Sequence, residues 1–419
     1  MPSQFRLRAG IVVVAVLSLL TPATSAQTPP DGEARSREIQ ELLDRRSAAV
    51  RAHDRNGFVD TLDPSAPTFR EAQLRWFDGA QAIPLAAFEL TLDLDRLGEL
   101  TREVDRKRYG APVVVGHVEQ RMGIEGFDVR PALDDLYYSF VQRDGRWRIA
   151  SDTDVEDVGL RTARQPWEFG PVELRRSAHF LMLVHPAEAR LADGLLRLAE
   201  SALPAVDRTW TSAWPGKVPI FVPSSGAELE RLLGAPIDVT HFVAFASAMI
   251  DRSGGWDLTG VRVLLNPSTF LTYGPDGRRS IFTHELFHVA TRGAAGPFIP
   301  AFLEEGFAQL AEVAGSSQLA RLTVGSARIE ARLPEDEEFS SGDGQEISSA
   351  YRRSLSAILY LRDRFGVEGV NRFYQRYGAA RVEPGTAEHH LERALAEALG
   401  ITRAQFEEGW RATATARAS

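Results

Sequence analysis

The chain has 419 residues, of which 44% are hydrophobic and 25% charged; this composition is typical of globular domains and excludes disordered, collagen-like and coiled-coil chains. The length suffices for about two or three domains. The net charge of −9 gives no electrostatic support for a nucleic-acid surface, so we expect no nucleic-acid partner. The absence of cysteine excludes disulfides, cysteine-ligated zinc, iron–sulfur clusters and a cysteine nucleophile.

The N-terminus has the three parts of a secretory signal peptide. Arg6 and Arg8 precede the apolar run Ile11–Leu20, and the small residues before Gln27 offer a cleavage site after Ala26. The run is shorter than the roughly 20 residues that span a bilayer, which disfavours the alternative of an uncleaved anchor. Residues 1–26 are therefore predicted to be a Sec-type signal peptide. We expect a secreted or periplasmic protein with no stable membrane insertion after cleavage.

Residues 27–165 are predicted to form one domain in which helices precede strands. The stretch Arg35–His53 has helical periodicity. The clearest strand signal is Asp135–Ile149, where two aromatic and β-branched runs flank an Asp-Gly dipeptide that is typical of a hairpin turn. Two weaker strand signals are Val113–Val115 and His117–Gln120.

Helices followed by an antiparallel sheet that ends in an Asp-Gly hairpin resemble the nuclear-transport-factor-2-like cone fold. The resemblance covers about residues 33–155 and depends on the order of the elements rather than on a sharp motif. Such cones often bind ligands or mediate contacts, and some are enzymes with a His/Asp pair in the cone. His53, His117 and several Asp residues are available for such a pair here. The alternative is that this domain is an accessory scaffold.

A second domain is predicted to begin near Val172, after a Gly- and Pro-containing boundary at residues 157–170. Strand and helix patterns alternate first, and from Ser280 onward the pattern is almost entirely helical. Strands followed by helices indicate an α+β fold. The predicted strands are Phe180–Val184, Val218–Val222, His241–Ile250 and Val261–Leu265, and the helices between them are Ala187–Trp210 and Ala227–Leu233.

The segment Ser280–Ala290 contains the motif H-E-x-x-H, formed by His284, Glu285 and His288. Histidines four residues apart project from one face of a helix, so their ring nitrogens can meet on a single metal ion. Glu285 lies beside that face, where its carboxylate can take a proton from metal-activated water. The motif predicts a zinc site with a general base.

A catalytic zinc ion usually has three protein ligands, and the next helical segment, Pro300–Glu312, offers a carboxylate. Glu304 and Glu305 are adjacent, so they point about 100° apart on a helix and only one can ligate well. Their spacing alone does not choose between them. Glu312 lies two turns after Glu305, where it can either bond a ligand histidine or remain a surface residue.

The two motifs together resemble those of gluzincin zinc metallopeptidases, and most closely the bacterial peptidase MA-like domains. The second helix of those domains reads roughly W-L-x-E-G-x-A, in which the Glu directly before Gly is the ligand. That position is Glu305, and Phe302 stands where the family usually has Trp. The resemblance covers residues 172–412 and implies a zinc ion held by His284, His288 and Glu305.

Aminopeptidase-like gluzincins also have a Tyr at the start of a helix such as Ser349–Gly366, and its O–H donates to the oxyanion of the tetrahedral intermediate. The matching residue here is Tyr351, which can alternatively be a half-buried anchor. The aminopeptidases carry G-x-M-E-N before the zinc helix. The corresponding segment Ala246–Asp251 lacks that Glu, so we do not expect an aminopeptidase.

We therefore expect an α+β protein with a cone-shaped domain at 27–165 and a thermolysin-like gluzincin domain at 172–412, in which helices follow a mixed sheet. The expected function is an exported zinc metallopeptidase acting on peptides or proteins, with Glu285 as general base. The alternatives are a catalytically silent binding protein on this scaffold, small-ligand binding by the N-terminal domain, and hydrolysis of a non-peptide bond. The acidic stretch from Pro334 to Gly344 is either a solvated loop or a cleft rim that favours basic substrates. The oligomeric state does not follow from the sequence.

Overall fold

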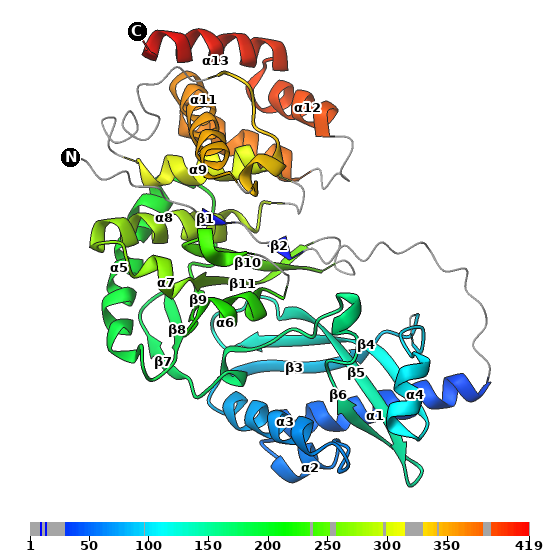
Figure 1. Cartoon of the computed structure of the whole chain (residues 1–419). Coiled ribbons are helices and arrows are strands. Elements are labelled where there is room, and N and C mark those ends of the chain that lie inside the picture. Colours follow the sequence, from blue (N-terminus) through cyan, green and yellow to red (C-terminus); the bar gives the residue numbers. More distant parts are fainter. Residues whose placement is uncertain are drawn as a thin grey trace.

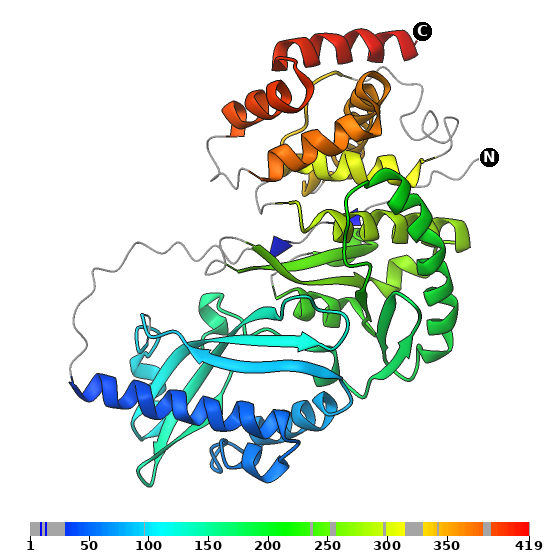
Figure 2. The same ribbon diagram turned by 180° about the vertical axis from the view of Figure 1, so that it is seen from behind.

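The computed structural model of the chain describes residues 9–10, 13–14, 30–95, 97–234, 238–251, 257–295, 299–314, 330–341, 343–379 and 387–418. The elements form an N-terminal four-stranded sheet with its helices, a central seven-stranded sheet, and a group of helices from the C-terminal part of the chain (Figures 1 and 2). This arrangement confirms the α+β class and the predicted order of a mixed sheet followed by helices.

The N-terminal sheet is antiparallel and curled, with the strand order β3-β4-β5-β6. Its strands are β3 (Leu85–Leu92), β4 (Val113–Ile124), β5 (Ala132–Arg143) and β6 (Arg146–Ser151). The helices around it are α1 (Pro30–Arg51), α2 (Arg55–Val59), α3 (Pro67–Ala80) and α4 (Glu103–Tyr109). The Asp144-Gly145 turn has positive φ at both residues, 49° and 72°, as the hairpin prediction requires. The sequence analysis missed α3 because Pro67 begins this helix rather than interrupting one.

The central sheet has the order β1-β10-β11-β9-β8-β7, with β2 beside β10. Its strands are β1 (Ala9–Gly10), β2 (Val13–Val14), β7 (Glu173–Arg176), β8 (Phe180–Val184), β9 (Val218–Val222), β10 (Ala244–Asp251) and β11 (Asp257–Leu265). Strands β8, β9 and β11 are parallel to one another, whereas β7 and β10 run antiparallel to their neighbours. The predicted strand at 241–250 begins later, because residues Val239–His241 form the short 3-10 helix η3.

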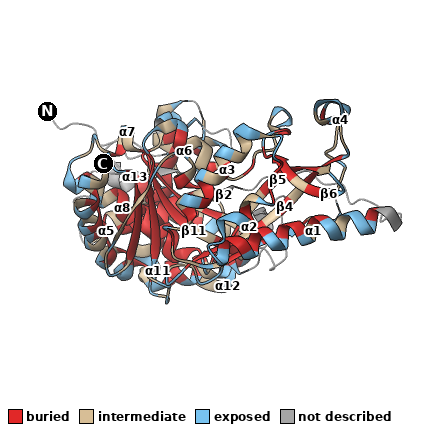
Figure 3. Ribbon diagram, turned by 90° about the horizontal axis from the view of Figure 1, so that it is seen from below, coloured by how far each residue is buried: buried red, intermediate tan, exposed pale blue. Residues whose placement is uncertain are grey.

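Both faces of the central sheet are covered, which explains the continuous apolar runs in β8 and β9. Met182 and Ile220 pack with α5 (Ala189–Thr209) and α8 (Pro275–Thr291) in one core. Leu183 and Phe221 face the opposite way, into a core that includes the N-terminal domain and α6 (Gly226–Leu233). Figure 3 shows the strands buried between these layers.

The remaining helices are α7 (Pro267–Phe270), α9 (Ala301–Glu312), α11 (Gly344–Gly378), α12 (Ala387–Leu399) and α13 (Arg403–Ala418), and the other 3-10 helices are η1 (Glu156–Val158), η2 (Pro166–Glu168) and η4 (Asp336–Phe339). Gly366 interrupts α11 with φ 72° and ψ 172°. The first part of α11 therefore ends where the sequence predicted, and a second helical stretch follows it directly.

Polar contacts fix the N-terminal sheet against the hairpin formed by β10 and β11. Gly260 has φ 60°, and a Cβ built there would lie 2.5 Å from Cβ of Ala132 on β5, so this close approach requires glycine. Three Arg–Asp pairs cross the same boundary: Arg121–Asp251 (3.3 Å), Arg130–Asp257 (2.5 Å) and Arg262–Asp128 (2.5 Å).

In the described part of the chain, no helix is both long and apolar enough to cross a membrane. Most of the predicted signal peptide lies outside the described residues. Within it, β1 and β2 pair in parallel with β10, Ala9 opposite Ala244 and Val13 opposite Ala248.

Candidate metal centre

Helix α8 carries the H-E-x-x-H motif through the middle of the protein. Pro275 occupies a first-turn position, where a missing N–H costs nothing, and Asp276 places negative charge at the N-terminal end. Every residue from Ile281 to Thr291 is buried, as expected for a helix enclosed on all sides. The helix packs against α5, α9 and β10, so the motif is held rigidly from several directions.

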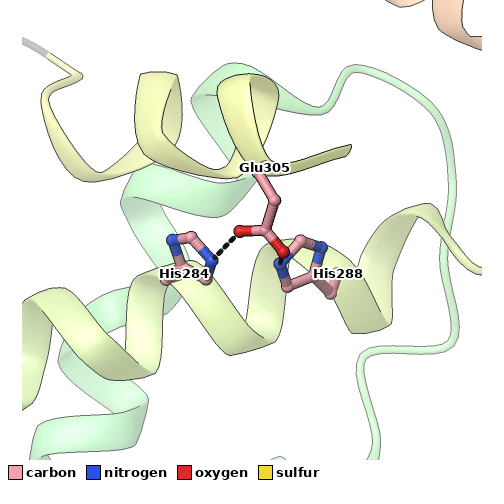
Figure 4. Close-up of side chains that lie close together, drawn as sticks. All are labelled: His284, His288 and Glu305. Carbon is pink, nitrogen blue, oxygen red and sulfur yellow. Dashed lines mark hydrogen bonds and ion pairs between the residues drawn. The ribbon is translucent and has the colours of Figure 1, made fainter. Parts of the chain in front are cut away.

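His284, His288 and Glu305 converge between α8 and α9 (Figure 4). One ligand atom from each residue lies within 4.8 Å of the others. Glu305 places one oxygen 3.0 Å from Nε2 of His284 and the other 3.8 Å from Nε2 of His288. All three residues are at most 2% exposed. This buried cluster can hold a metal ion.

Two features fix the position of helix α9 and therefore the position of Glu305. The backbone N–H of Ala301, in the first turn, donates to the Asp336 carboxylate at 2.8 Å. Gly306 then allows α11 to come close, since a Cβ there would lie 2.7 Å from the carbonyl oxygen of Ser354. The Glu-Gly pair of the motif therefore combines a ligand with the close contact that holds its helix.

The structure separates the two adjacent carboxylates that the spacing left equivalent. Glu305 joins the two histidines, whereas Glu304 points to Arg292, whose Nη1 donates to it at 3.0 Å. Burial raises the pKa of Glu304 to about 7, and the positive charge of Arg292 opposes this shift. Sequence reasoning missed Arg292, although its position four residues after His288 placed it on the same helical face.

Glu312 contacts the metal cluster rather than solvent. Its carboxylate accepts a hydrogen bond from Nδ1 of His284 at 2.5 Å and another from the Ser280 hydroxyl at 2.9 Å. A carboxylate on the outer nitrogen orients the imidazole and leaves Nε2 directed at the cluster, which is the usual arrangement around ligand histidines.

Glu285 and His288 carry buried polar atoms that no other side chain hydrogen-bonds. Glu285 is fully buried with its carboxylate near the backbone of Ala246, and among the described residues no side chain donates a hydrogen bond to it or bonds the ring nitrogens of His288. Buried polar atoms without partners are costly, so they indicate a site built for a ligand absent from the protein chain itself. A metal ion and water fit this donor set.

The buried charges shift the pKa values of the cluster in different directions. Burial lowers the pKa of His284, but the carboxylates of Glu312 and Glu305 outweigh it and raise the pKa well above 6.5. Burial and the neighbouring charges of His284 and Arg292 hold the pKa of His288 well below that value. Burial raises the pKa of Glu285 to about 8, against the opposing charge of His284. The protein thus concentrates carboxylates around the two imidazoles.

Tyr351 lies beside the cluster, on the first part of α11. It is 6% exposed, and its ring centroid is 6.5 Å from that of His284. Burial raises its pKa well above 10, and the carboxylates of Glu305 and Glu285 add to the shift, so the phenol remains a neutral O–H donor. Phe339 of η4 packs against the ring with 5.3 Å between the ring centroids, so η4 helps to hold Tyr351 in place.

Two further predictions on polar residues have clear outcomes. Of the two histidines considered for a His/Asp pair in the cone, His53 is exposed after α1, whereas His117 on β4 lies between two aspartates, 3.0 Å from Asp93 and 2.8 Å from Asp135. In the acidic stretch, Glu338 pairs with Arg332 and the buried Arg353, and Asp336 caps α9. These two carboxylates therefore serve the structure rather than a substrate.

Comparison with models of known protein families gives no match, and neither does comparison with the curated proteins.

Proposed function

We propose that this protein is an exported zinc metallopeptidase. The observation that carries the proposal is the buried convergence of His284, His288 and Glu305, with the buried carboxylate of Glu285 beside them. Its resemblance to the gluzincins in the paired motifs H-E-x-x-H and E-G supports the same assignment. The charged and apolar stretches within residues 1–26 support export.

Zinc is the metal that this donor set fits best. Two imidazoles and one carboxylate are a common protein ligand set for catalytic zinc, which keeps a further position open for substrate or water. When bound, zinc supplies a Lewis acid that polarises a carbonyl group and makes water more acidic. Glu312 supports the set by orienting His284 through its Nδ1.

The side chains around the cluster provide the remaining steps of hydrolysis. Glu285 takes a proton from the attacking water and delivers it to the leaving amine, as a general base and then a general acid. The O–H of Tyr351 donates a hydrogen bond to the oxygen that gains negative charge as the carbonyl is attacked. The burial of both residues strengthens these interactions because water does not screen them.

The edge of β10 supports a peptide as substrate. Among the described residues, only the dipeptides β1 and β2 pair with the side of β10 away from β11. Cleavage after Ala26 would remove both dipeptides and free this edge. An extended peptide could then pair with β10 through its main chain, close to the metal cluster.

Glu285→Gln tests the function most simply. We expect this isosteric variant to bind zinc as tightly as the wild type within threefold, and to lose peptide hydrolysis by at least about 100-fold, since the general base is gone. Glu346→Gln, an exposed change at the start of α11, is the control and should leave both properties unchanged. A wild type that binds zinc and peptides but hydrolyses none would favour a silent binding protein. Retained activity in Glu285→Gln would refute the mechanism.

A further inference from the structure

A buried ion pair lies directly behind the metal cluster. Arg292 and Glu304 are bonded at 3.0 Å, with side chains only 3% and 8% exposed. Each is next to the motif in sequence: Arg292 follows His288 by one helical turn, and Glu304 immediately precedes Glu305. The pair therefore links α8 to α9 next to the point at which a metal ion held by His288 and Glu305 would also link the two helices.

The same pair reaches two further elements. Nη2 of Arg292 donates to the carbonyl oxygen of Ala246 on β10 at 3.4 Å. The hydroxyl of Tyr374 on α11 lies 3.5 Å from the Glu304 carboxylate and donates to Thr291 at 3.2 Å. One guanidinium and one carboxylate thus connect α8 and α9 to β10, the strand that the proposed function assigns to substrate pairing.

Stability alone does not account for this pair. Removing two charges from water is costly, and apolar replacements of buried ion pairs are often neutral or stabilising. A guanidinium instead determines geometry, because its planar set of N–H donors fixes the relative positions of the oxygens that it bonds. Arg292 uses these donors on one oxygen from α9 and one from β10.

We propose that the Arg292–Glu304 pair is a positioning unit that sets Glu305 for metal binding and aligns β10 with the metal centre. The inference rests on the proposed function, since it gives this pair a role at the zinc site. Neither residue is assigned contact with the substrate. They act through Glu305 and through the backbone of β10.

The charges around the metal cluster also favour a positioning role for this pair. Four carboxylates surround the site, those of Glu285, Glu304, Glu305 and Glu312, and Arg292 bonds one of them. In its ionised form Glu304 neutralises Arg292, which would otherwise place an uncompensated positive charge close to a divalent cation. Replacing Glu304 by Gln weakens the link between α8 and α9 and also unmasks that charge, so both effects lower zinc affinity.

The test compares Glu304→Gln with a matched control, Asp128→Asn. The control makes the same carboxylate-to-amide change in an equally buried pair, Arg262–Asp128, whose side chains are 8% and 5% exposed at the domain boundary. Zinc dissociation constants of the folded, full-length proteins are measured by competition with a chelator. We expect a constant at least tenfold higher for Glu304→Gln, in the range seen for residues that support metal ligands, and one within threefold of wild type for Asp128→Asn.

A zinc dissociation constant for Glu304→Gln within threefold of wild type would overturn the proposal, as would an equal loss in Asp128→Asn. If Glu304→Gln does not fold, Arg292→Lys decides, because its compact ammonium keeps the charge but lacks the rigid planar fork that fixes the two oxygens relative to each other. We expect at least a threefold higher constant for it, and a wild-type constant would overturn the proposal. Failure of the proposed function is distinguishable, because the wild type itself would then bind no zinc.

Discussion

The contact between Glu312 and His284 allows a quantitative prediction for zinc affinity. Nδ1–H of His284 donates to the Glu312 carboxylate at 2.5 Å, which is a charge-assisted hydrogen bond. Such bonds contribute about 1.5–3 kcal/mol, and neutral ones about half as much. Glu312→Gln retains a neutral acceptor and so loses about 0.75–1.5 kcal/mol. At about 1.4 kcal/mol per decade, the zinc affinity should become roughly three- to twelvefold weaker.

The assay is chelator competition on the folded variant, with Glu200→Gln as the control. Glu200 accepts a hydrogen bond from Nδ1 of His179 at 2.7 Å, so the control removes the same kind of bond from a histidine outside the metal cluster. We expect unchanged zinc affinity in Glu200→Gln. A wild-type affinity in Glu312→Gln would refute the reasoning, because it would mean that the carboxylate does not orient the ligand.

Three further predictions concern other parts of the structure. Tyr351→Phe should keep the zinc content and lower kcat by about 100-fold or more, because one oxyanion donor is lost; an unchanged kcat in steady-state assays would make Tyr351 an anchor only. Burial lowers the pKa of His117, but hydrogen bonds to its two aspartates outweigh this and raise the pKa to about 9. Its stabilisation is therefore complete below about pH 6.5 and is lost as pH rises through 9. Denaturant titrations should show the free-energy difference between wild type and His117→Gln shrinking by about 3 kcal/mol over that range, and a constant difference would contradict it. Gly306→Ala should lower stability by about 1–3 kcal/mol and weaken zinc binding, since its methyl would meet the α11 backbone; a wild-type unfolding midpoint would argue against that contact.

Local sequence patterns were sufficient to predict the elements whose residue types alone indicate a strand or a turn. The strand Phe180–Val184 and the hairpin around Asp144 were both predicted, since apolar runs and turn dipeptides report on the residues that contain them. Helix α3 and strand β3 were missed because their boundaries depend on packing against the sheet. A Pro such as Pro67 reads equally as a break or as a helix start.

Helical spacing predicted the part of the candidate site that lies on a single helix. His284 and His288 share a helix, so their common face followed from the motif. The choice between Glu304 and Glu305 required a family resemblance, since it depends on how α9 rotates against α8. Arg292 shows the limit: spacing placed it near the site, but its contact with Ala246 joins residues 46 positions apart and needed the folded chain.

The central claim is a zinc site built from the buried histidines and Glu305. Metal analysis of the purified wild type and of Glu305→Ala tests it most directly, with the exposed Glu346→Ala as a control for handling. The account predicts one zinc per chain in the wild type and the control, and none retained in Glu305→Ala. A wild type that neither contains nor takes up zinc, or a Glu305→Ala protein that keeps a full complement, would contradict it.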